Sequence, residues 1–284
     1  MRVAAVQLNS TGDKGRNLAS AERLVRAAAA DGAELVALPE KWNLLGPGEE
    51  MAAGAEPLDG PSLTAARGWA RELGIHLLAG SVAERGEDGG KAFNTSVLVG
   101  PDGGDLAVYR KIHMFDVTAG GVEYRESEHE EAGGEIVTAE LADAAPGGDG
   151  LTLGLSVCYD LRFPELYRIL AVRGARLLAV PSAFTLATGR DHWEVLLRAR
   201  AIENQAFVLA PNQVGEAPPH YHSYGHSAIV DPWGVVLAIA PDEECFVAAD
   251  LDLSAQERIR EELPSLANRR PEKYVWPQLL EARA

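Results

Sequence analysis

The sequence predicts an α/β protein built as a four-layer α-β-β-α sandwich of two similar halves. DGAELVALPE (31–40) aligns with RGARLLAVPS (173–182), sharing Gly, Ala, Leu, Ala and Pro in register. SVLVGPDG (96–103) likewise aligns with SAIVDPWG (227–234). Strands such as VAAV and LLAV are apolar throughout, which is typical of sheets buried on both faces. We expect each sheet to carry helices on one face and to pack against the other sheet through its bare face. The alternative is that helix–strand junctions and Pro-Gly turns look alike in any α/β chain.

The first half follows a strand–helix order that ends in a hairpin. Short apolar runs predict its strands, and apolar residues at helical spacing predict its helices. Gly32 stands near the end of the first helix, Pro39 stops the second strand, and a turn at 101–103 divides the hairpin. In order, the elements are a strand at 3–8, a helix at 17–32, a strand at 34–40, a helix at 63–74, a strand at 75–84 and a hairpin at 94–111.

The second half repeats this order after a stretch at 117–150 that is rich in Gly, Glu and Ala and predicts loops around short strands. No linker-like segment divides the chain, so we expect a single domain over 1–284, with a C-terminal tail at 254–284 that packs on the body or on a second copy. The elements of this half are a strand at 151–158, a helix at 164–174, a strand at 176–182, a helix at 191–205, a strand at 206–213 and a hairpin at 226–240.

The composition of the chain indicates which kinds of binding partner and which cellular compartment to expect. The 284 residues, 46% of them hydrophobic, support a large core, and the net charge of -16 disfavours nucleic acid and anionic membranes as partners. The N-terminus turns polar too soon for a signal peptide, and no apolar run approaches the ~20 residues that span a bilayer. Two cysteines make no disulfide framework, so we expect a cytoplasmic protein with reduced thiols, in which Cys245 is a core residue.

Three polar residues stand where predicted strands end. Glu40 follows ELVALP, Lys111 follows DLAVYR and Cys158 follows LTLGLSV. Ligand sites in α/β sheets commonly lie beyond the carboxyl ends of strands, so these residues are candidates for one catalytic set. Each also has a structural explanation of its own. Cys158 could be a core residue, Glu40 a helix N-terminal acid and Lys111 a surface lysine.

The chemistry of the three groups is complementary. A thiol has a pKa near ~8.5 and needs a base to become a good nucleophile, and a partly buried carboxylate can take its proton. Attack on a carbonyl or nitrile carbon then builds negative charge on the substrate. A lysine ammonium and a backbone N–H can hold that charge, and the N–H of Tyr159, directly after the cysteine, is well placed to do so.

The segments around these residues resemble a known family. ALPEKW (37–42), YRKIHMFDV (109–117) and SVCYDLRFPELYR (156–168) are similar to the three catalytic segments of the nitrilase superfamily of carbon–nitrogen hydrolases. The stretches at 181–205 and 224–234 resemble its Nit branch, which includes ω-amidases and amidases of deaminated glutathione. The resemblance runs from residue 1 to about residue 275. It implies an α-β-β-α sandwich and an amidase that converts RCONH₂ and water into a carboxylate and ammonia.

The resemblance also implies roles for residues. Glu40 would be the general base, Lys111 the charge-stabilising amine and Cys158 the nucleophile. The family's second glutamate lies in a short segment after the lysine, which YRESEHEEAGG (124–134) matches, and we assign it to Glu126 among several neighbouring acids. The preceding VTAGGVEY lacks the family's more usual Asp-x-Pro-Gly version. Because that loop helps to wall the pocket in relatives, the departure bears on which substrate is bound.

Substrate contacts follow partly from chemistry and partly from the resemblance. Arg162 could bind a substrate carboxylate through its bidentate guanidinium, or it could form a salt bridge to Asp160, Glu165 or another nearby acid. A carboxylate-bearing amide is therefore the expected substrate. The other residues expected to contact it are Tyr124, Tyr159, Phe184 and Thr185.

Neither a metal nor an organic cofactor is expected. His113 and His226 have no partner at metal-ligand spacing and are expected to be structural, and no Cys/His cluster indicates zinc. No Gly-rich loop leads from a strand to a helix at phosphate-binding spacing.

Other functions stay open at this point. A nitrilase or an N-carbamoyl amino acid hydrolase would use the same Glu-Lys-Cys chemistry. A non-catalytic scaffold could keep the fold, and an unrelated hydrolase could pair the cysteine with a histidine. By resemblance we also expect a homodimer, formed through the helix at 164–174 and the tail. The apolar residues that suggest it are Leu166, Leu170, Leu263, Tyr274 and Trp276.

Overall fold

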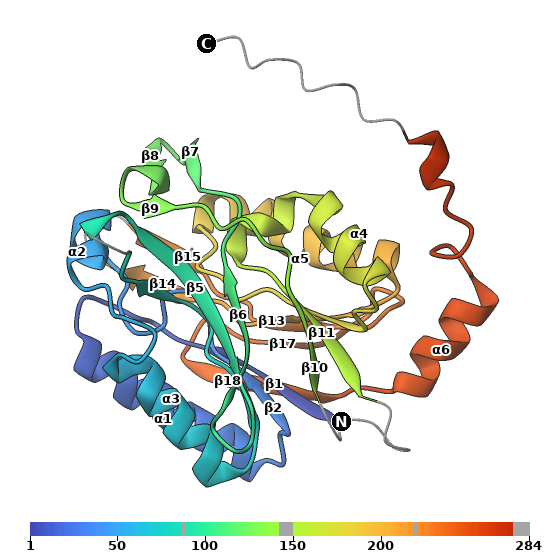
Figure 1. The fold of residues 1–284 in the computed structure, drawn as a ribbon, viewed down its shortest axis with the longest axis horizontal. Helices are drawn as coiled ribbons and strands as arrows, with labels where there is room; N and C mark the ends of the chain where they lie inside the picture. Colours follow the sequence, from blue (N-terminus) through green and yellow to red (C-terminus); the bar gives the residue numbers. More distant parts are fainter. Residues whose placement is uncertain (87–88, 142–149, 218–220, 275–284) are drawn as a thin grey trace.

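The computed structural model describes residues 1–86, 89–141, 150–217 and 221–274. These residues form two large sheets stacked face to face, with a pair of helices against the outer face of each (Figure 1). The predicted α-β-β-α sandwich is confirmed.

The first sheet has eight strands in the order β18-β1-β2-β3-β5-β4, with β6 and β9 also paired to β5. Helices α1 (Lys14–Ala30) and α3 (Pro61–Leu73) pack against its outer face. Its strands are β1 (Arg2–Gln7), β2 (Leu35–Ala37), β3 (His76–Leu78), β4 (Val82–Glu84), β5 (Ala92–Val99), β6 (Asp105–Arg110), β9 (Glu130–Glu131) and β18 (Cys245–Asp250).

The second sheet has six strands in the order β10-β11-β12-β13-β16-β17. Helices α4 (Pro164–Val172) and α5 (Leu186–Asn204) cover its outer face. Its strands are β10 (Thr138–Leu141), β11 (Leu151–Leu155), β12 (Leu177–Ala179), β13 (Phe207–Ala210), β16 (Ala228–Val230) and β17 (Val236–Ile239).

The two halves share one topology, as the internal repeats predict. Strands β1, β2 and β3 run parallel and β5 returns antiparallel to β3. In the same way β11, β12 and β13 run parallel and β16 returns antiparallel to β13. The first sheet is completed by a strand from the far end of the chain, since β18 pairs with β1 from Arg2↔Asp250 to Gln7↔Cys245.

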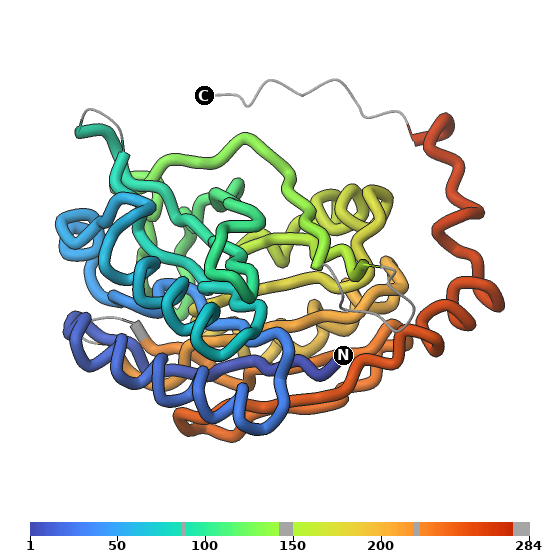
Figure 2. The backbone as a smooth tube through the Cα atoms, turned by 60° about the horizontal axis from the view of Figure 1, so that its bottom comes forward, coloured from blue at the N-terminus to red at the C-terminus, as the bar shows by residue number. Residues whose placement is uncertain are grey.

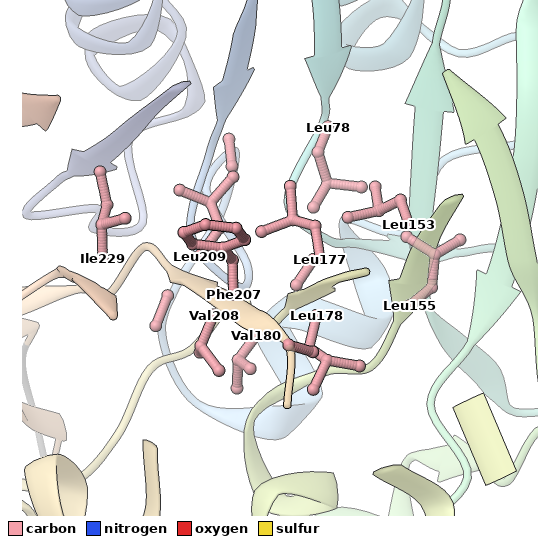
Figure 3. Close-up of a cluster of buried hydrophobic side chains, with 14 of the residues drawn as sticks. Leu78, Leu153, Leu155, Leu177, Leu178, Val180, Phe207, Val208, Leu209 and Ile229 are labelled. Carbon is pink, nitrogen blue, oxygen red and sulfur yellow. The ribbon is translucent and has the colours of Figure 1, made fainter. Parts of the chain in front are cut away.

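The burial of β1 on both faces explains why its sequence is apolar at every central position. Val3 belongs to the core between the two sheets, whereas Ala4 belongs to the core under α1 and α3. Figure 3 shows the inter-sheet core, where Leu78 of the first sheet lies beside Leu177 of the second. The side chains that hold the sheets together therefore come from residues far apart in the sequence.

Some boundaries differ from the prediction. The strand predicted at 75–84 is two strands, β3 and β4, separated by Gly80 with φ +42°. A Cβ at Gly80 would lie 2.0 Å from the carbonyl oxygen of Pro39, so the chain bends where it passes the end of β2. Helix α5 begins earlier than predicted, at Leu186. Helix α2 (Gly48–Ala53) and the pair β14 (Val214–Ala217) and β15 (Tyr221–Tyr224) were not predicted.

The C-terminal segment holds helix α6 (Leu253–Glu262) and a short 3-10 helix, η4 (Pro271–Lys273). Helix α6 is fixed to the second half, because Gln256 Nε2 donates to the carbonyl oxygens of Arg176 and Gln205 at 2.9 and 3.0 Å. Beyond α6 the chain leaves the body of the sandwich (Figures 1 and 2). Leu263 and Tyr274 are exposed, as expected, and Trp276 lies outside the described residues. Leu166 and Leu170 are instead buried in the core, so the prediction that they form an exposed apolar surface is wrong. None of the described helices has the length and apolar character that a membrane span requires.

Candidate active site

A pocket of about 430 Å³ opens where strands of both halves end, and its walls bring together every residue predicted for the site. It also contains residues that the sequence did not single out, among them Lys41 and Glu130. The predicted residues that line it are Glu40, Lys111, Glu126, Cys158, Tyr124, Tyr159, Arg162, Phe184 and Thr185.

Cys158 is the first residue of the short helix η3 (Cys158–Arg162), in a sharp turn that follows β11. Its backbone has φ +47°, the left-handed region that residues other than glycine seldom adopt. Its N–H donates to the carbonyl oxygen of Pro181 at 2.9 Å. The side chain is 9% exposed and lines the pocket, so the turn brings the thiol from the end of a buried strand to the pocket wall.

Asp160 fixes this turn against the strand end that carries Lys111. Its buried carboxylate accepts hydrogen bonds from the Val157 N–H at 2.8 Å and the Tyr109 hydroxyl at 2.7 Å. It also accepts from the His113 N–H at 3.1 Å, and His113 Nδ1 lies 2.7 Å away. Tyr109 and His113 stand on either side of Lys111, so one carboxylate sets the spacing of thiol and ammonium.

Glu40 lies just beyond β2 and is 4% exposed. One carboxylate oxygen accepts from Asn94 Nδ2 at 2.8 Å and from Lys111 Nζ at 3.1 Å. The other accepts from the Ala183 N–H at 2.8 Å, which lies beyond β12 of the second sheet. The acid is therefore oriented by groups from both halves.

Glu126 is the second carboxylate of the site, and it belongs to the short helix η2 (Glu126–Glu128). Lys111 Nζ donates to both of its oxygens, at 2.7 and 2.8 Å. Glu126 also accepts from the Phe115 N–H at 2.7 Å and from Asn94 Nδ2 at 3.2 Å. Lys111 is 1% exposed, so its ammonium is held between two carboxylates away from solvent. This contact distinguishes Glu126 from the acids around it.

Electrostatics define the resting protonation states. Burial raises the pKa of Glu40, but the Lys111 ammonium and a hydrogen bond from Cys158 outweigh it, so the net shift is downward. Burial and the Glu40 charge hold the pKa of the Cys158 thiol well above its usual range. Burial lowers the pKa of Lys111, but Glu126 and Glu40 raise it well above its usual value. At rest the site thus holds a thiol beside an ionised carboxylate and an ammonium.

The other side of the pocket is lined by aromatic residues and by Arg162. Tyr159 packs edge-on against Phe115, with ring centroids 5.0 Å apart. The guanidinium of Arg162 lies 5.2 Å from the centre of the Phe184 ring, and its Nη1 lies 3.2 Å from His192 Nδ1. Within the described residues Arg162 forms no salt bridge with Asp160 or Glu165.

The remaining predictions concern histidines and the second cysteine. His113 stacks on Phe163 at 3.6 Å between ring centroids, and His226 stacks on Tyr224 at 4.3 Å. In the part of the chain that the structure describes, no group of three His, Cys, Asp or Glu residues could hold a metal ion. Cys245 lies in strand β18 but is only partly buried, so the expectation of a core cysteine is wrong.

Three groups of contacts in the site had only weak signals in the sequence. Asn94 donates to both Glu40 and Glu126, Asp160 organises the nucleophile turn, and Lys41 forms a buried ion pair with Glu130. The contacts of Asn94 and Lys41 depend on strands that meet only in the folded sheet, whereas Asp160 accepts from Val157 within its own turn. The polar residues within the largely apolar run of β5 and the acid two positions after Cys158 were the only hints available.

Comparison with known proteins agrees with this geometry. A family model described as carbon-nitrogen hydrolase matches residues 2–261. The chain is 41% identical over 268 residues to a deaminated glutathione amidase of Synechocystis sp., covering 94% of this chain and 97% of that protein. It is 39% identical over 275 residues to omega-amidase NIT2 of Homo sapiens, covering 96% of each. The crystal structure of the C. elegans NitFhit protein superposes with a TM-score of 0.87 at 39% identity, covering 96% of this chain and 66% of that one.

Proposed function

The chain belongs to the carbon–nitrogen hydrolase family and is an amidase, and we propose that it cleaves its substrate through a thioester on Cys158. The observation that carries this mechanism is that the side chains of Cys158, Glu40 and Lys111 line one pocket, with Lys111 Nζ 3.1 Å from the Glu40 carboxylate. Such a set can activate a nucleophile and stabilise the charge that its attack creates.

In the first step Glu40 accepts the proton of Cys158 as the sulfur attacks the amide carbon. The carbonyl π electrons move to oxygen, and Lys111 and the N–H of Tyr159 hold the resulting oxyanion. Glu126 keeps the Lys111 ammonium charged and fixed in place through its two short contacts. Because these groups are oriented before substrate binds, little reorganisation is needed at the moment of attack.

In the second step the oxyanion collapses and the carbon–nitrogen bond breaks. Protonated Glu40 gives its proton to the leaving nitrogen, which departs as ammonia and leaves a thioester. Water then enters, Glu40 removes its proton, and the hydroxide equivalent attacks the thioester carbon. Collapse of this second intermediate breaks the carbon–sulfur bond, and Glu40 returns the proton to the sulfur. The products are a carboxylic acid and the resting enzyme.

The substrate is an amide that carries a carboxylate. Arg162 supports this choice, because it lines the pocket and no carboxylate of the described residues neutralises it. A guanidinium binds a carboxylate through two parallel hydrogen bonds. The names of the relatives point the same way, toward ω-amides or deaminated glutathione.

Mass spectrometry tests the mechanism. Rapid quenching with substrate in excess should reveal an acyl group on the peptide that contains Cys158 and none on the peptide that contains Cys245. Iodoacetamide should label Cys158 faster than Cys245 in the wild type, and the preference should vanish in Glu40→Gln. Equal labelling rates together with no acylated peptide would contradict the thioester and favour a non-catalytic scaffold.

A substrate panel separates this function from its neighbours in the family. Ammonia release from ω-amides, with none from nitriles and none from N-carbamoyl amino acids, is the expected result. Preferential turnover of nitriles or of carbamoyl compounds would contradict the proposed substrate class. It would remain compatible with the proposed roles of Glu40, Lys111 and Cys158.

We also propose a homodimer that works in the cytoplasm. Helices α4 and α5 pack against each other and leave apolar side chains in solvent, which a second copy could cover. The free thiols suit a reducing compartment. Sedimentation at twice the monomer mass of 30.3 kDa is expected, and a species at the monomer mass would remove the dimer. The exposed residues concerned are Ile169, Val172, Val195 and Ile202.

A further inference from the structure

A buried ion pair lies in the pocket wall and takes no part in the mechanism above. Lys41 directly follows Glu40, and its side chain contacts the carboxylate of Glu130. Both side chains are 4% exposed, and both residues line the pocket. The second oxygen of Glu130, Oε2, is buried with no hydrogen-bond partner among the described residues. Within the described part of the chain, Lys41 is the residue that forms an ion pair with Glu130.

The backbone at Lys41 explains how two adjacent residues both reach the pocket. Successive side chains of an extended strand point to opposite faces. Lys41 instead has φ +54°, and this left-handed turn allows Glu40 and Lys41 to line the same cavity. The turn is held because the Lys41 N–H donates to Ser81 Oγ at 3.1 Å and the Trp42 N–H donates to the Ser81 carbonyl oxygen at 3.3 Å.

Glu130 connects this turn to the segment that carries the second glutamate. It lies in β9, which pairs with β5 at Ala92 and Phe93. Next along β5 comes Asn94, whose Nδ2 donates to Glu40 and to Glu126. The pair thus closes a ring of contacts that passes from Glu40 through Lys41 and β9 to Glu126, and back through Asn94.

The charges around the ring also favour ionised Glu40. The groups that face Glu40 are Lys111 beyond β6, Cys158 of η3 and Lys41, and each lowers its pKa. Those that face Lys41 are Glu130, Glu126, Glu40 and Lys111. Burial lowers the pKa of Lys41 to about 8 against the opposing effect of Glu126 and Glu40.

We propose that Lys41 and Glu130 are positioning residues, whose ion pair fixes the spacing of Glu40 and Glu126 around Lys111 and keeps a positive charge beside the general base. This inference rests on the proposed role of Glu40. A buried ion pair can often be replaced by apolar residues without loss of stability, so stability gives it no advantage over a hydrocarbon contact. An apolar replacement of Lys41 and Glu130 would instead lose the effect that the ion pair has on Glu40.

Four proteins separate the structural effect from the catalytic one: the wild type, Lys41→Met, Glu130→Leu and the double variant. Each single change leaves a buried charge without its partner, and its melting temperature should fall by about 6–10 °C. The double variant should recover to within about 3 °C of the wild type. Its kcat/KM should nevertheless fall about two- to threefold more at pH 5 than at pH 8, through kcat rather than KM, because Glu40 protonates more readily without the neighbouring ammonium.

Lys41→Arg and a distant pair serve as controls. Lys41→Arg keeps the charge, so it should retain the acid side of the wild-type pH profile. Lys14 and Glu56 form an ion pair that lies outside the pocket, and replacing them with Met and Leu should leave that profile unchanged. If the double variant regains its melting temperature and also shows the wild-type pH profile, the inference is wrong. Retained turnover in Glu40→Gln would overturn the proposed function instead.

Discussion

The carboxylate of Asp160 accepts a hydrogen bond of 2.7 Å from the hydroxyl of Tyr109, and both side chains are buried. This contact joins the turn that holds Cys158 to the strand that leads to Lys111. Nucleophile and ammonium come from different sheets, so their spacing depends on contacts of this kind rather than on either strand alone. Replacing Asp160 is therefore expected to change the turnover rate as well as the free energy of unfolding.

Replacing Asp160 with Ala should destabilise the fold and slow turnover together. The change leaves the Val157 and His113 N–H groups and the Tyr109 hydroxyl without their acceptor, which costs about 3–5 kcal/mol in a buried network. Urea denaturation with parallel kcat measurements checks this. Tyr109→Phe removes one of the donors, so it should cost about 1 kcal/mol and leave most of kcat. If Asp160→Ala and Tyr109→Phe lowered stability and kcat equally, Asp160 would not be the residue that organises this network.

Glu40→Gln should reduce kcat by about 10²–10⁴-fold, because glutamine keeps the size of the side chain but cannot accept the thiol proton. Single-turnover experiments should show that formation of the acyl-enzyme is slowed. Lowering the pH in the wild type should reproduce the loss as Glu40 becomes protonated. A variant that turns over normally would point to another base, such as a histidine.

Stability should fall on the acid side partly through Glu40. Its pKa is lowered in the folded protein, so it contributes stability above its unfolded pKa of about 4.3, and this contribution is lost as the pH falls through the folded value. The pKa of Lys111 is raised, so its contribution is complete below about pH 10 and is lost at higher pH. Denaturation from pH 3 to pH 9 should show a plateau near neutrality and a shallower acid slope in Glu40→Gln.

Arg162→Met should raise KM for carboxylate-bearing amides by about 10–100-fold, since charge-assisted hydrogen bonds contribute about 1.5–3 kcal/mol. A neutral amide of similar length is the control substrate, and its KM should change little. Measuring both substrates with both enzymes isolates the charge effect. An equal increase in KM for the two amides would show that Arg162 shapes the pocket and does not bind the substrate carboxylate.

Gly80→Ala should destabilise the protein strongly, because the added Cβ would meet the Pro39 carbonyl oxygen at 2.0 Å and the residue has φ +42°. Since Pro39 precedes Glu40, kcat should fall as well. Gly68→Ala in α3 is the matched control, with open space around the new Cβ, and should stabilise by about 0.5–1 kcal/mol. Thermal unfolding of the two variants measures the contrast.

Local patterns were sufficient to predict the fold and the residues at strand ends. Glu40, Lys111 and Cys158 each follow a predicted strand, so a common site at strand ends could be inferred before the structure, although the strands belong to two different sheets. The resemblance to a family then separated Glu126 from its acidic neighbours, and its contact with Lys111 agrees with that choice.

What the sequence could not predict depends on contacts between distant segments. Glu130 meets Lys41 only because two residues of β9 pair with β5, and no periodicity marks so short a strand. Gly80 breaks a continuous apolar run because the end of β2 passes it too closely for a side chain. Asp160 resembled a partner for Arg162, whereas its oxygens are occupied by backbone groups and by Tyr109.

The pairing of β18 with β1 has a consequence for synthesis on the ribosome. Until residue 250 has left the exit tunnel, β1 presents an unpaired edge, and the N-terminal sheet remains open to the wrong partner. A nascent chain truncated before β18 would thus contain every catalytic side chain and still lack the edge strand that pairs with β1. The enzyme is expected to gain activity only after β18 has been translated and has paired with β1.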